Sequence, residues 1–257
     1  MSGPRLHTPD WHVPGNVIAR VSNRHGGVSA APFDSFNLAL HVGDDPAAVQ
    51  QNRERLLQEL PAGMCVQWLE QVHGTTVVDA DWQSPQRCGD AVYVDKPGLA
   101  GAVLTADCLP VFFAARSGRR VAVAHAGWRG LAAGILETTL ARFADAPDDV
   151  VTWLGPAIGV CHFEVGLEVR DIFLDACATA SQRQHMQAMA FRPAARADKC
   201  HADLYALARL RLQTAGVREV GGGGLCTHCD AAHYYSFRRD GRTGRFVSIV
   251  GLAPDQH

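Results

Sequence analysis

The amino-acid sequence predicts a mixed α+β fold, a single-domain α/β sandwich built on mixed sheets. Hydrophobic residues make up 47% of the 257 residues and charged residues 19%, which is typical of a packed globular protein. Several strand-like segments follow one another with no helix between them, which favours mixed sheets over a doubly wound parallel sheet. Because no segment resembles a linker, residues 1–257 are expected to form one catalytic domain, with an irregular segment over roughly residues 1–15.

The first half of the chain is predicted to contain one helix followed by five strands. Asp45 and Pro46 are typical of a helix start, with an aspartate cap followed by proline at the first helical position. This helix is expected to end near Leu60, because Pro61 follows. Short apolar runs then predict strands over residues 65–69, 91–94, 101–105, 111–115 and 121–125.

The second half of the chain is predicted to alternate between helices and strands. A helix is expected over residues 129–144, because Ala132, Leu136, Leu140 and Phe143 fall on one face. The glycine run at residues 221–224 predicts a flexible turn. The other expected elements are a strand over residues 150–154, helices near residues 168–177 and 203–213, and strands near residues 234–237 and 246–250.

Charge and hydropathy argue against several classes of protein. A net charge of −2 is not typical of a dedicated DNA-binding or membrane-binding protein. The most apolar stretch, residues 99–115, is interrupted by Asp107 and Pro110, and the N-terminal residues lack the pattern of a secretory signal. We therefore expect a cytoplasmic protein that acts on small molecules, without nucleic-acid or membrane partners. The sequence makes no prediction of its oligomeric state.

Three short motifs place reactive side chains at the edges of apolar runs. They are QVHG at residues 71–74, TADCLP at 105–110 and AHAGWRG at 124–130. Their reactive members, His73, Cys108 and His125, match a zinc ligand set that leaves a fourth position for water or substrate. The same three residues also match a Cys-His nucleophile pair. The alternative is that they are unrelated, because strand-end cysteines and single histidines are commonly packing residues.

The spacing of the histidines argues against a true multicopper oxidase. The twelve histidines include no pair separated by a single residue, whereas copper oxidase centres use closely spaced pairs. Cys226 and Cys229 form a Cys-x2-Cys pair, with His233 four residues further on, which is a zinc signal. Only one such pair exists, so ordinary reduced thiols are the preferred interpretation and a second metal site the alternative. Cys65, Cys88, Cys161, Cys177 and Cys200 are expected to be packing or surface thiols.

Arginines are the candidates for binding phosphate. Arg129 lies at the predicted start of a helix, where free N–H groups and the helix dipole favour an anion. Arg238 and Arg239 precede a glycine-containing turn and are further candidates, while Arg24 and Arg53 are weaker ones. In each case the alternative is a solvated surface arginine.

The three motifs, with others, resemble the laccase-domain family, which is also labelled polyphenol-oxidase-like. The further motifs are NRHGGVS (23–29), FNLALHVGDDP (36–46), GPAIGVCHFEVG (155–166) and YYSFRRDGRTGR (234–245). The resemblance implies that His73, Cys108 and His125 form a zinc triad. It implies phosphorolysis of adenosine, inosine, guanosine and 5′-methylthioadenosine, together with adenosine deamination. It also implies a fold similar to the catalytic domain of bacterial deamidating toxins.

Three mechanisms remain open from the sequence. Zinc lowers the pKa of bound water to about 7, so hydroxide could deaminate adenosine while Asp107 or Glu70 supplies a proton. In a Cys-His hydrolase, Cys108 would be the nucleophile, His125 the base and His73 a supporting group. The third alternative is a binding module without catalysis. The old oxidase label reflects copper, which can occupy a Cys and His ligand set in vitro.

Overall fold

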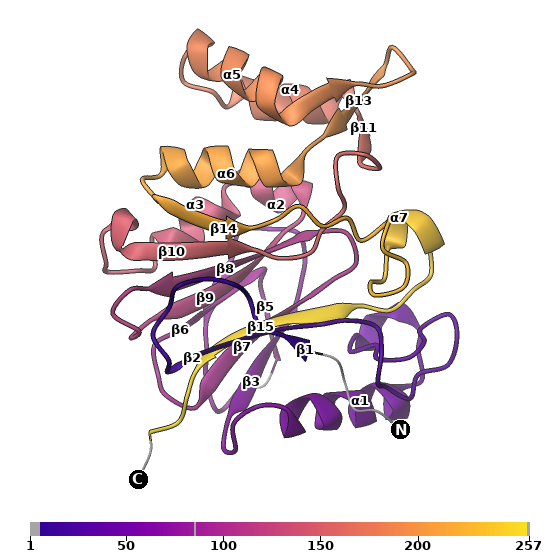
Figure 1. Ribbon diagram of the computed structural model, residues 1–257, viewed down its shortest axis with the longest axis vertical. Helices are drawn as coiled ribbons and strands as arrows, with labels where there is room; N and C mark the ends of the chain where they lie inside the picture. The colour runs from indigo at the N-terminus through magenta and orange to yellow at the C-terminus, as the bar shows by residue number, and fades with distance from the viewer. Residues whose placement is uncertain (1–5, 85, 256–257) are drawn as a thin grey trace.

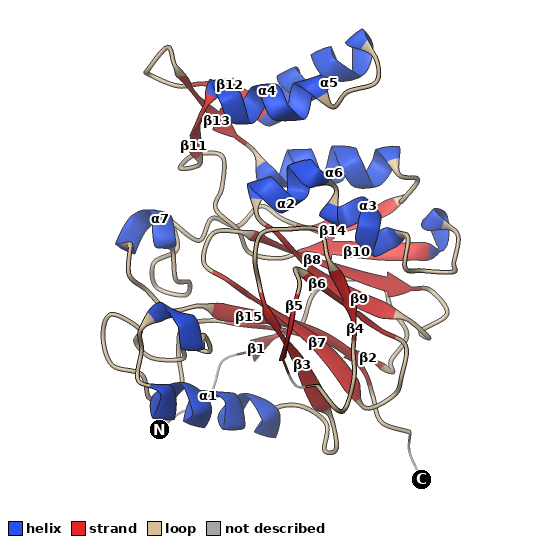
Figure 2. Ribbon diagram, turned by 180° about the vertical axis from the view of Figure 1, so that it is seen from behind, coloured by secondary structure: helices blue, strands red, loops and turns tan. Residues whose placement is uncertain are grey.

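The computed structural model describes residues 6–84 and 86–255, and these form a layered α/β sandwich. Figure 1 shows two mixed sheets stacked on each other, with α1 below them and α2, α3 and α6 above. A smaller unit of α4, α5 and a third sheet lies above α6. Figure 2 shows the same order of layers from behind. This confirms the predicted fold class, a sandwich of mixed sheets.

The strands form two six-stranded sheets and one three-stranded sheet. The first sheet, in spatial order, contains β1 (Leu6–His7), β2 (Val17–Ser22), β15 (Phe246–Leu252), β7 (Leu99–Thr105), β3 (Cys65–Glu70) and β5 (Gln86–Cys88). The second contains β14 (Glu219–Gly222), β10 (Val150–Leu154), β8 (Leu109–Ala115), β9 (Val121–Ala126), β6 (Ala91–Val94) and β4 (Val77–Asp79). The third contains β11 (Glu164–Gly166), β13 (Lys199–Ala202) and β12 (Phe191–Pro193).

Helices lie on the outer faces of the two large sheets, in the smaller unit above α6 and, in the case of α7, to one side of the sheets. They are α1 (Pro46–Gln58), α2 (Trp128–Ala133), α3 (Ile135–Leu140), α4 (Leu167–Asp175), α5 (Ala180–Ala190), α6 (Leu204–Thr214) and α7 (Phe237–Asp240). The start of α1 is as predicted, because the Asp45 side chain accepts a hydrogen bond from the backbone N–H of Ala47 and Pro46 opens the helix. Val49 and Leu56 of this helix are buried.

Three hydrophobic cores separate the layers. One lies between the two large sheets and includes Phe112, Val123 and Phe246. A second joins the outer face of the second sheet to α2, α3 and α6, and a third lies between the first sheet and α1. Strands β7, β8, β9 and β15 are buried at every residue, because layers cover both of their faces. This explains why their sequences are continuous apolar runs rather than alternating ones.

Three sequence predictions are wrong in detail. The helix expected over residues 129–144 is two helices, α2 and α3, because Gly134 adopts a left-handed conformation (φ 101°) and ends the first of them. No strand forms over residues 234–237, since Ser236 caps the start of α7 by accepting a hydrogen bond from the N–H of Arg239. The glycine run at residues 221–224 is not simply a turn, because its first two residues complete β14 beside β10.

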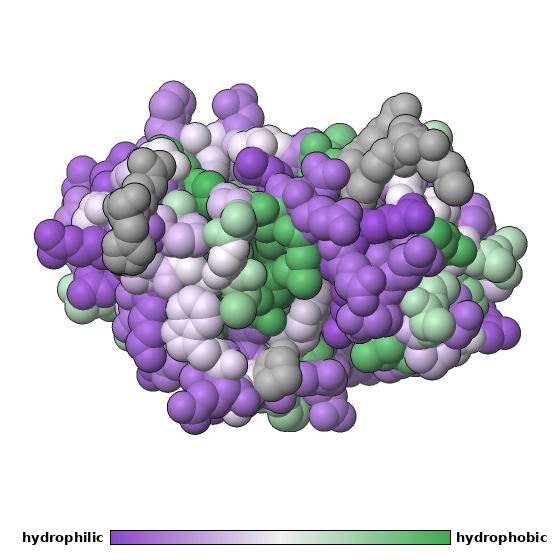
Figure 3. Space-filling model, turned by 90° about the horizontal axis from the view of Figure 1, so that it is seen from below, coloured by the Kyte–Doolittle hydropathy of each residue, from purple (hydrophilic) through white to green (hydrophobic). Residues whose placement is uncertain are grey.

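The face that carries α1 is mainly hydrophilic. Figure 3, seen from that side, shows a central hydrophobic group and smaller hydrophobic patches toward the edges, among mainly hydrophilic residues. Across the chain, the large hydrophobic side chains that remain exposed come from separate elements, for example Leu57 of α1 and Phe237 of α7. Within residues 6–84 and 86–255, no helix has the length and apolar character needed to cross a membrane.

Candidate metal and substrate site

One edge of the two large sheets gathers the predicted reactive residues. Strand β7 ends at Thr105 and β8 begins at Leu109, so Cys108 lies in the short connection between the two sheets. Pro110 of β8 pairs with His125 near the end of β9, which places His125 beside that connection. His73 follows the end of β3, and Asp90 precedes β6, whose first residue pairs with Ala124.

The structure brings His73, Cys108 and His125 together. One ligand atom from each lies within 4.8 Å of the others, and the Cys108 sulfur is 3.9 Å from Nε2 of His73. The imidazole rings have centroids 4.7 Å apart. A side chain at Gly127 would lie 2.9 Å from His73 and 3.1 Å from the Cys108 sulfur. Glycine is therefore required at residue 127 for these three groups to approach each other.

Asp90 holds the two histidines in place. Its fully buried carboxylate pairs with Nδ1 of His125 at 2.9 Å. It also accepts hydrogen bonds from the backbone N–H groups of His73 at 2.9 Å and Gly74 at 2.7 Å. A carboxylate on Nδ1 leaves Nε2 of His125 directed at Cys108 as the free ligand or base. One buried side chain thus orients the imidazole of His125 and fixes the backbone that carries His73.

Two residues at the site have strained backbone conformations. His73 has φ of 60° and Asp107 has φ of 98°, in the region that favours glycine. Asp90 supports the first residue, as described above. The Asp107 carboxylate accepts hydrogen bonds from the Thr227 hydroxyl and the backbone N–H of Arg238, both at 2.7 Å. Such conformations persist only where the surroundings hold them, and they cluster at functional sites.

The cysteine and histidine alter each other's protonation. Burial opposes ionisation of Cys108, but the adjacent imidazoles, His125 foremost, lower its pKa to about 6. Burial also opposes the charged form of His125, but the Cys108 thiolate and Asp90 raise its pKa to about 9. A thiolate beside two imidazoles is the form that binds a metal ion or attacks as a nucleophile.

A cavity of about 330 Å³ opens over these residues. Ile158, Phe163 and Phe237 give it an apolar wall, and Phe237 of α7 is 58% exposed. Polar and cationic side chains also line the cavity, among them His41, Gln71, Arg238 and Arg245. Ligand sites commonly have about this volume or more, and combine apolar walls with a few polar groups.

The arginines are distributed differently from the prediction. Arg129 is exposed, stacks on Trp128 at 4.3 Å and does not line the cavity, and the helix it opens has six residues. The structure therefore places Arg129 away from the cavity over the triad, and its predicted role in phosphate binding stays a prediction. Arg239 also lies outside the cavity lining, and its guanidinium bonds the carbonyls of Thr227, His228 and Tyr234. Arg238 does line the cavity.

The weaker candidates have other roles. Arg24 pairs with Asp34, and Arg53 stacks on Trp68 at 4.0 Å. Glu70 is exposed and does not line the cavity, and both carboxylate oxygens of Asp107 already accept hydrogen bonds. Neither acid is therefore placed as a free proton donor.

Sequence reasoning missed three residues of the site. Asp90 belongs to no motif, and its signal is only a single carboxylate directly before an apolar strand. His41 and Arg245 lie within two of the quoted motifs, but nothing in their spacing indicates that they meet. Both line the cavity, and burial followed by the charges of Arg245 and Arg53 lowers the pKa of His41.

The cysteines outside the triad divide into two groups. Cys65 and Cys88 are exposed and Cys200 is buried, as packing or surface thiols should be. Cys161 is not an isolated thiol, because its sulfur lies 3.6 Å from those of Cys226 and Cys229. Chain folding joins residues that are more than sixty positions apart, which spacing alone does not reveal. His233 does not join them, since its Nδ1 pairs with Asp230.

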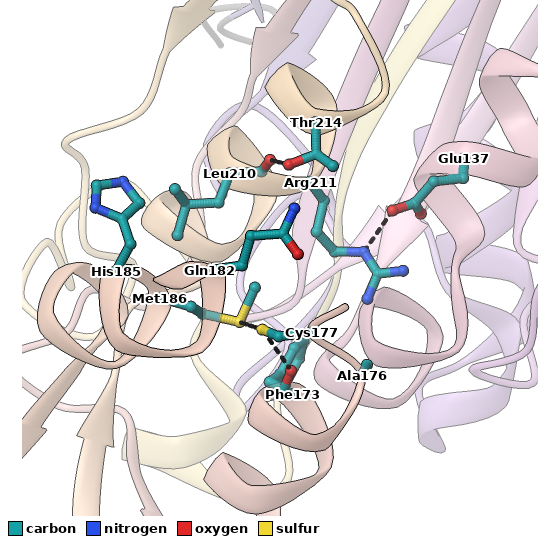
Figure 4. Close-up of a pocket in the computed structure, with 10 residues that line it drawn as sticks. All are labelled: Glu137, Phe173, Ala176, Cys177, Gln182, His185, Met186, Leu210, Arg211 and Thr214. Atoms are coloured by element: carbon teal, nitrogen blue, oxygen red, sulfur yellow. Dashed lines mark hydrogen bonds and ion pairs between the residues drawn. The ribbon is translucent and has the colours of Figure 1, made fainter. Parts of the chain in front are cut away.

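A separate cavity lies between α4, α5 and α6. Figure 4 shows its lining residues, among them Cys177 and Met186, whose sulfurs are 3.8 Å apart. Arg211 pairs with Glu137 at 2.6 Å at its edge. None of the residues that line this cavity belongs to the His73, Cys108 and His125 group.

The sequence of residues 18–253 matches the family described as multi-copper polyphenol oxidoreductase laccase. The chain belongs to this laccase family. The match spans the two large sheets apart from β1 and the first residue of β2, and it includes all three triad residues. Despite the family's description, the triad alone supplies one small ligand group rather than the closely spaced histidine pairs of a multicopper centre.

Curated members of the laccase family carry a different name. A protein of Pseudomonas aeruginosa named purine nucleoside phosphorylase is 53% identical over 245 residues, covering 95% of this chain and 97% of the relative. The purine nucleoside phosphorylase YfiH of Escherichia coli is 47% identical, with 96% of this chain and 99% of the relative covered.

Solved structures confirm the fold. A Neisseria meningitidis protein of the domain family DUF152 superposes with a TM-score of 0.89 at 44% identity, covering 96% of this chain and 99% of that one. The YlmD protein of Geobacillus stearothermophilus gives a TM-score of 0.82 at 33% identity, with 93% of each chain covered.

The donor set fits a metal ion. One thiolate and two imidazoles reach a common point, and Asp90 on Nδ1 of His125 is the arrangement that orients metal-bound histidines. Three protein ligands beside a cavity leave a coordination position open to substrate.

Proposed function

We propose that this protein is a zinc-dependent purine nucleoside phosphorylase. The observation that carries the proposal is the convergence of His73, Cys108 and His125 on the floor of a cavity with an apolar wall and two arginines. The names of the curated relatives support the reaction class. Zinc is the metal that suits a mixed thiolate and imidazole set with one open position, although copper binds such sets in vitro.

The apolar wall accounts for recognition of the base. Phe163, Phe237 and Ile158 contribute two aromatic rings and one aliphatic side chain to the cavity lining. A purine ring buries its faces well against such side chains. The proposed substrates are adenosine, inosine, guanosine and 5′-methylthioadenosine, which share the purine ring and differ in polar groups at its edge or at C5′ of the sugar.

The cationic residues account for recognition of phosphate. Arg245 is half-buried, and its guanidinium bonds the carbonyls of Thr243 and Gly244, which fixes its direction. Arg238 bonds the carbonyl of Glu164 at 2.9 Å and stacks over Phe163. Each guanidinium has further N–H donors to offer a phosphate oxygen.

The residues of this chain divide the reaction between them. In phosphorolysis the glycosidic bond breaks, phosphate oxygen bonds to the ribosyl C1′, and the departing purine takes up a proton. Arg238 and Arg245 would hold the nucleophilic phosphate, while Asp90 on Nδ1 would keep Nε2 of His125 available as a ligand beside Cys108. When bound, zinc supplies Lewis acidity and can activate water, which would also permit deamination of adenosine as a second activity.

A cysteine hydrolase is the second candidate, and one observation favours it. Cys108, His125 and Asp90 form a chain in which the carboxylate orients the imidazole and the imidazole stabilises the thiolate. In that case Cys108 would be free to react with iodoacetamide in the protein as purified. A metal-bound Cys108 would react only after a chelator removes the metal.

The test is a turnover assay on protein with measured metal content. Inosine should yield hypoxanthine and ribose 1-phosphate only when phosphate is added, and Cys108→Ala should abolish the reaction. The matched control is Cys65→Ser, because Cys65 is an exposed thiol at the start of β3. Wild-type protein that binds metal at the triad but releases no base from any of the four nucleosides would overturn the proposal.

A further inference from the structure

A second group of potential ligands lies outside the cavity. Cys161, His162, Cys226 and Cys229 each place one ligand atom within 4.8 Å of all the others. The first two belong to the turn before β11, and the last two to the turn between β14 and α7. None of the four lines the cavity over the triad.

The distances within this cluster match those of a tetrahedral metal site. Zinc bonds of about 2.3 Å to sulfur and about 2.0–2.1 Å to nitrogen place two sulfurs about 3.8 Å apart and a sulfur and a nitrogen about 3.6 Å apart. The sulfur of Cys161 is 3.6 Å from the sulfurs of Cys226 and Cys229. Nδ1 of His162 lies 3.3 Å from Cys161, 3.3 Å from Cys229 and 4.0 Å from Cys226.

The surroundings hold the ligands in this arrangement. The backbone N–H of Gly159 donates to the sulfur of Cys226 at 3.2 Å, as N–H groups do to a coordinated thiolate. The Thr227 N–H donates to the Ala157 carbonyl at 3.0 Å, which ties one turn to the other. The ring of His162 stacks on that of His228 with centroids 3.8 Å apart, so its direction is fixed.

We propose that Cys161, His162, Cys226 and Cys229 bind a second zinc ion, in a closed structural site separate from the triad. Three thiolates and one imidazole complete a tetrahedral shell, so no position is left for substrate. Such a shell is typical of structural zinc, and thiolate-rich sites favour zinc over harder cations.

The proposed site would position the catalytic cysteine indirectly. Thr227 lies between Cys226 and Cys229, is fully buried, and donates its hydroxyl to Asp107 at 2.7 Å. Asp107 precedes Cys108 and has the strained φ described above. Zinc at the cluster would fix the turn that holds Asp107, which makes Thr227 a positioning residue.

The test counts metal ions by native mass spectrometry in protein expressed with zinc and kept reduced. Wild-type protein should carry two zinc ions per chain, Cys108→Ala one, and Cys161→Ser one. Cys65→Ser is the control and should keep two, since Cys65 lies outside both groups. The count does not depend on which reaction the triad performs, so a failed nucleoside assay leaves it valid.

If Cys161→Ser does not fold, cobalt substitution in Cys108→Ala and in wild-type protein replaces the zinc count as the test. Cys108→Ala loaded with cobalt should show the intense absorption of tetrahedral cobalt bound to several thiolates, and wild-type protein should show it as well. A single zinc ion in wild-type protein, absent from Cys108→Ala, would overturn the proposal. So would a disulfide among Cys161, Cys226 and Cys229 in protein kept reduced throughout purification.

Discussion

The triad and the second cysteine cluster use the same ligand types in opposite ways. His73, Cys108 and His125 come from the ends of strands and line a cavity, and the fully buried Asp90 bonds the ring of His125 and the backbone of His73. Cys161, His162, Cys226 and Cys229 come from two turns and do not line the cavity over the triad. Three ligands with an open side suit catalysis, whereas four ligands suit a structural ion. Ligand number and support, more than ligand identity, separate the two proposed roles.

The largest expected difference in turnover is between variants that each lose one candidate ligand, one from the triad and one from the second cluster. Cys108→Ala should lower phosphate-dependent release of hypoxanthine to the background of the assay, because the proposed function makes the Cys108 thiolate a ligand of the zinc ion. Cys161→Ser should retain measurable turnover, since Cys161 does not reach the cavity. Steady-state kinetics on both variants measure the contrast. Equal loss in the two would show that both groups serve the fold alone.

The next effect concerns the buried carboxylate. Asp90→Asn should lower triad metal affinity or turnover by about 10–100-fold, because the amide no longer fixes Nδ1 of His125 as a donor. Zinc titration against a chromophoric chelator measures the affinity. Asp81→Asn is a useful control, since the Asp81 carboxylate accepts a hydrogen bond from the local backbone N–H of Gln83 and lies outside the triad. Unchanged zinc affinity and turnover in Asp90→Asn would show that Asp90 is not needed to orient the imidazole of His125.

Phosphate recognition gives a smaller but more selective effect. Arg245→Ala should raise the KM for phosphate about tenfold to a hundredfold, because a charge-assisted hydrogen bond contributes about 1.5–3 kcal/mol. The KM for nucleoside should change much less. Arg129→Ala is the matched control and should leave both constants near the wild-type values, since Arg129 lies outside the cavity. A larger effect at Arg129 than at Arg238 or Arg245 would reverse the assignment.

The smallest expected effect on turnover comes from the hydrogen bond between Thr227 and Asp107, which connects the second cluster to the triad. Thr227→Val removes the hydroxyl that bonds Asp107 while keeping the shape of the side chain. Losing this buried hydrogen bond should cost about 1–3 kcal/mol of stability, and kcat should fall more than the KM for nucleoside changes. Thermal unfolding and kinetics together measure it. Wild-type kcat in this variant would show that the turn does not position Cys108.

The sequence predicted the strands of the two large sheets that are buried on both faces, but it did not predict β1, β2, β4, β5 or β14. Residues 91–94 and 150–154 form strands with the predicted bounds. Every residue of both strands is buried, so each strand is a continuous apolar run that is easily recognised in the sequence. The third sheet was missed because its strands are short and partly polar, as in Glu164–Gly166. Gly134 breaks a helix through its left-handed backbone conformation, which the apolar spacing of the neighbouring residues conceals.

The candidate site was predicted only where one motif carries one reactive residue. His73, Cys108 and His125 each stand out at a strand end, so the sequence named them and the fold brings them together. Asp90 and Arg245 act through neighbours that are distant in the sequence, and no spacing rule identifies them. The same reason explains Cys161, whose partners are 65 and 68 residues away.

The central claim is that phosphorolysis depends on a zinc ion at the triad, and a reconstitution titration tests it most directly. A Cys161→Ser variant, in which the second proposed site is disabled, should be stripped with a chelator and titrated with zinc while phosphate-dependent hypoxanthine release from inosine is measured. The account predicts no turnover without zinc and a rise that reaches its plateau at one ion per chain. Full turnover by the stripped protein, or zinc binding with no turnover at any stoichiometry, would contradict it.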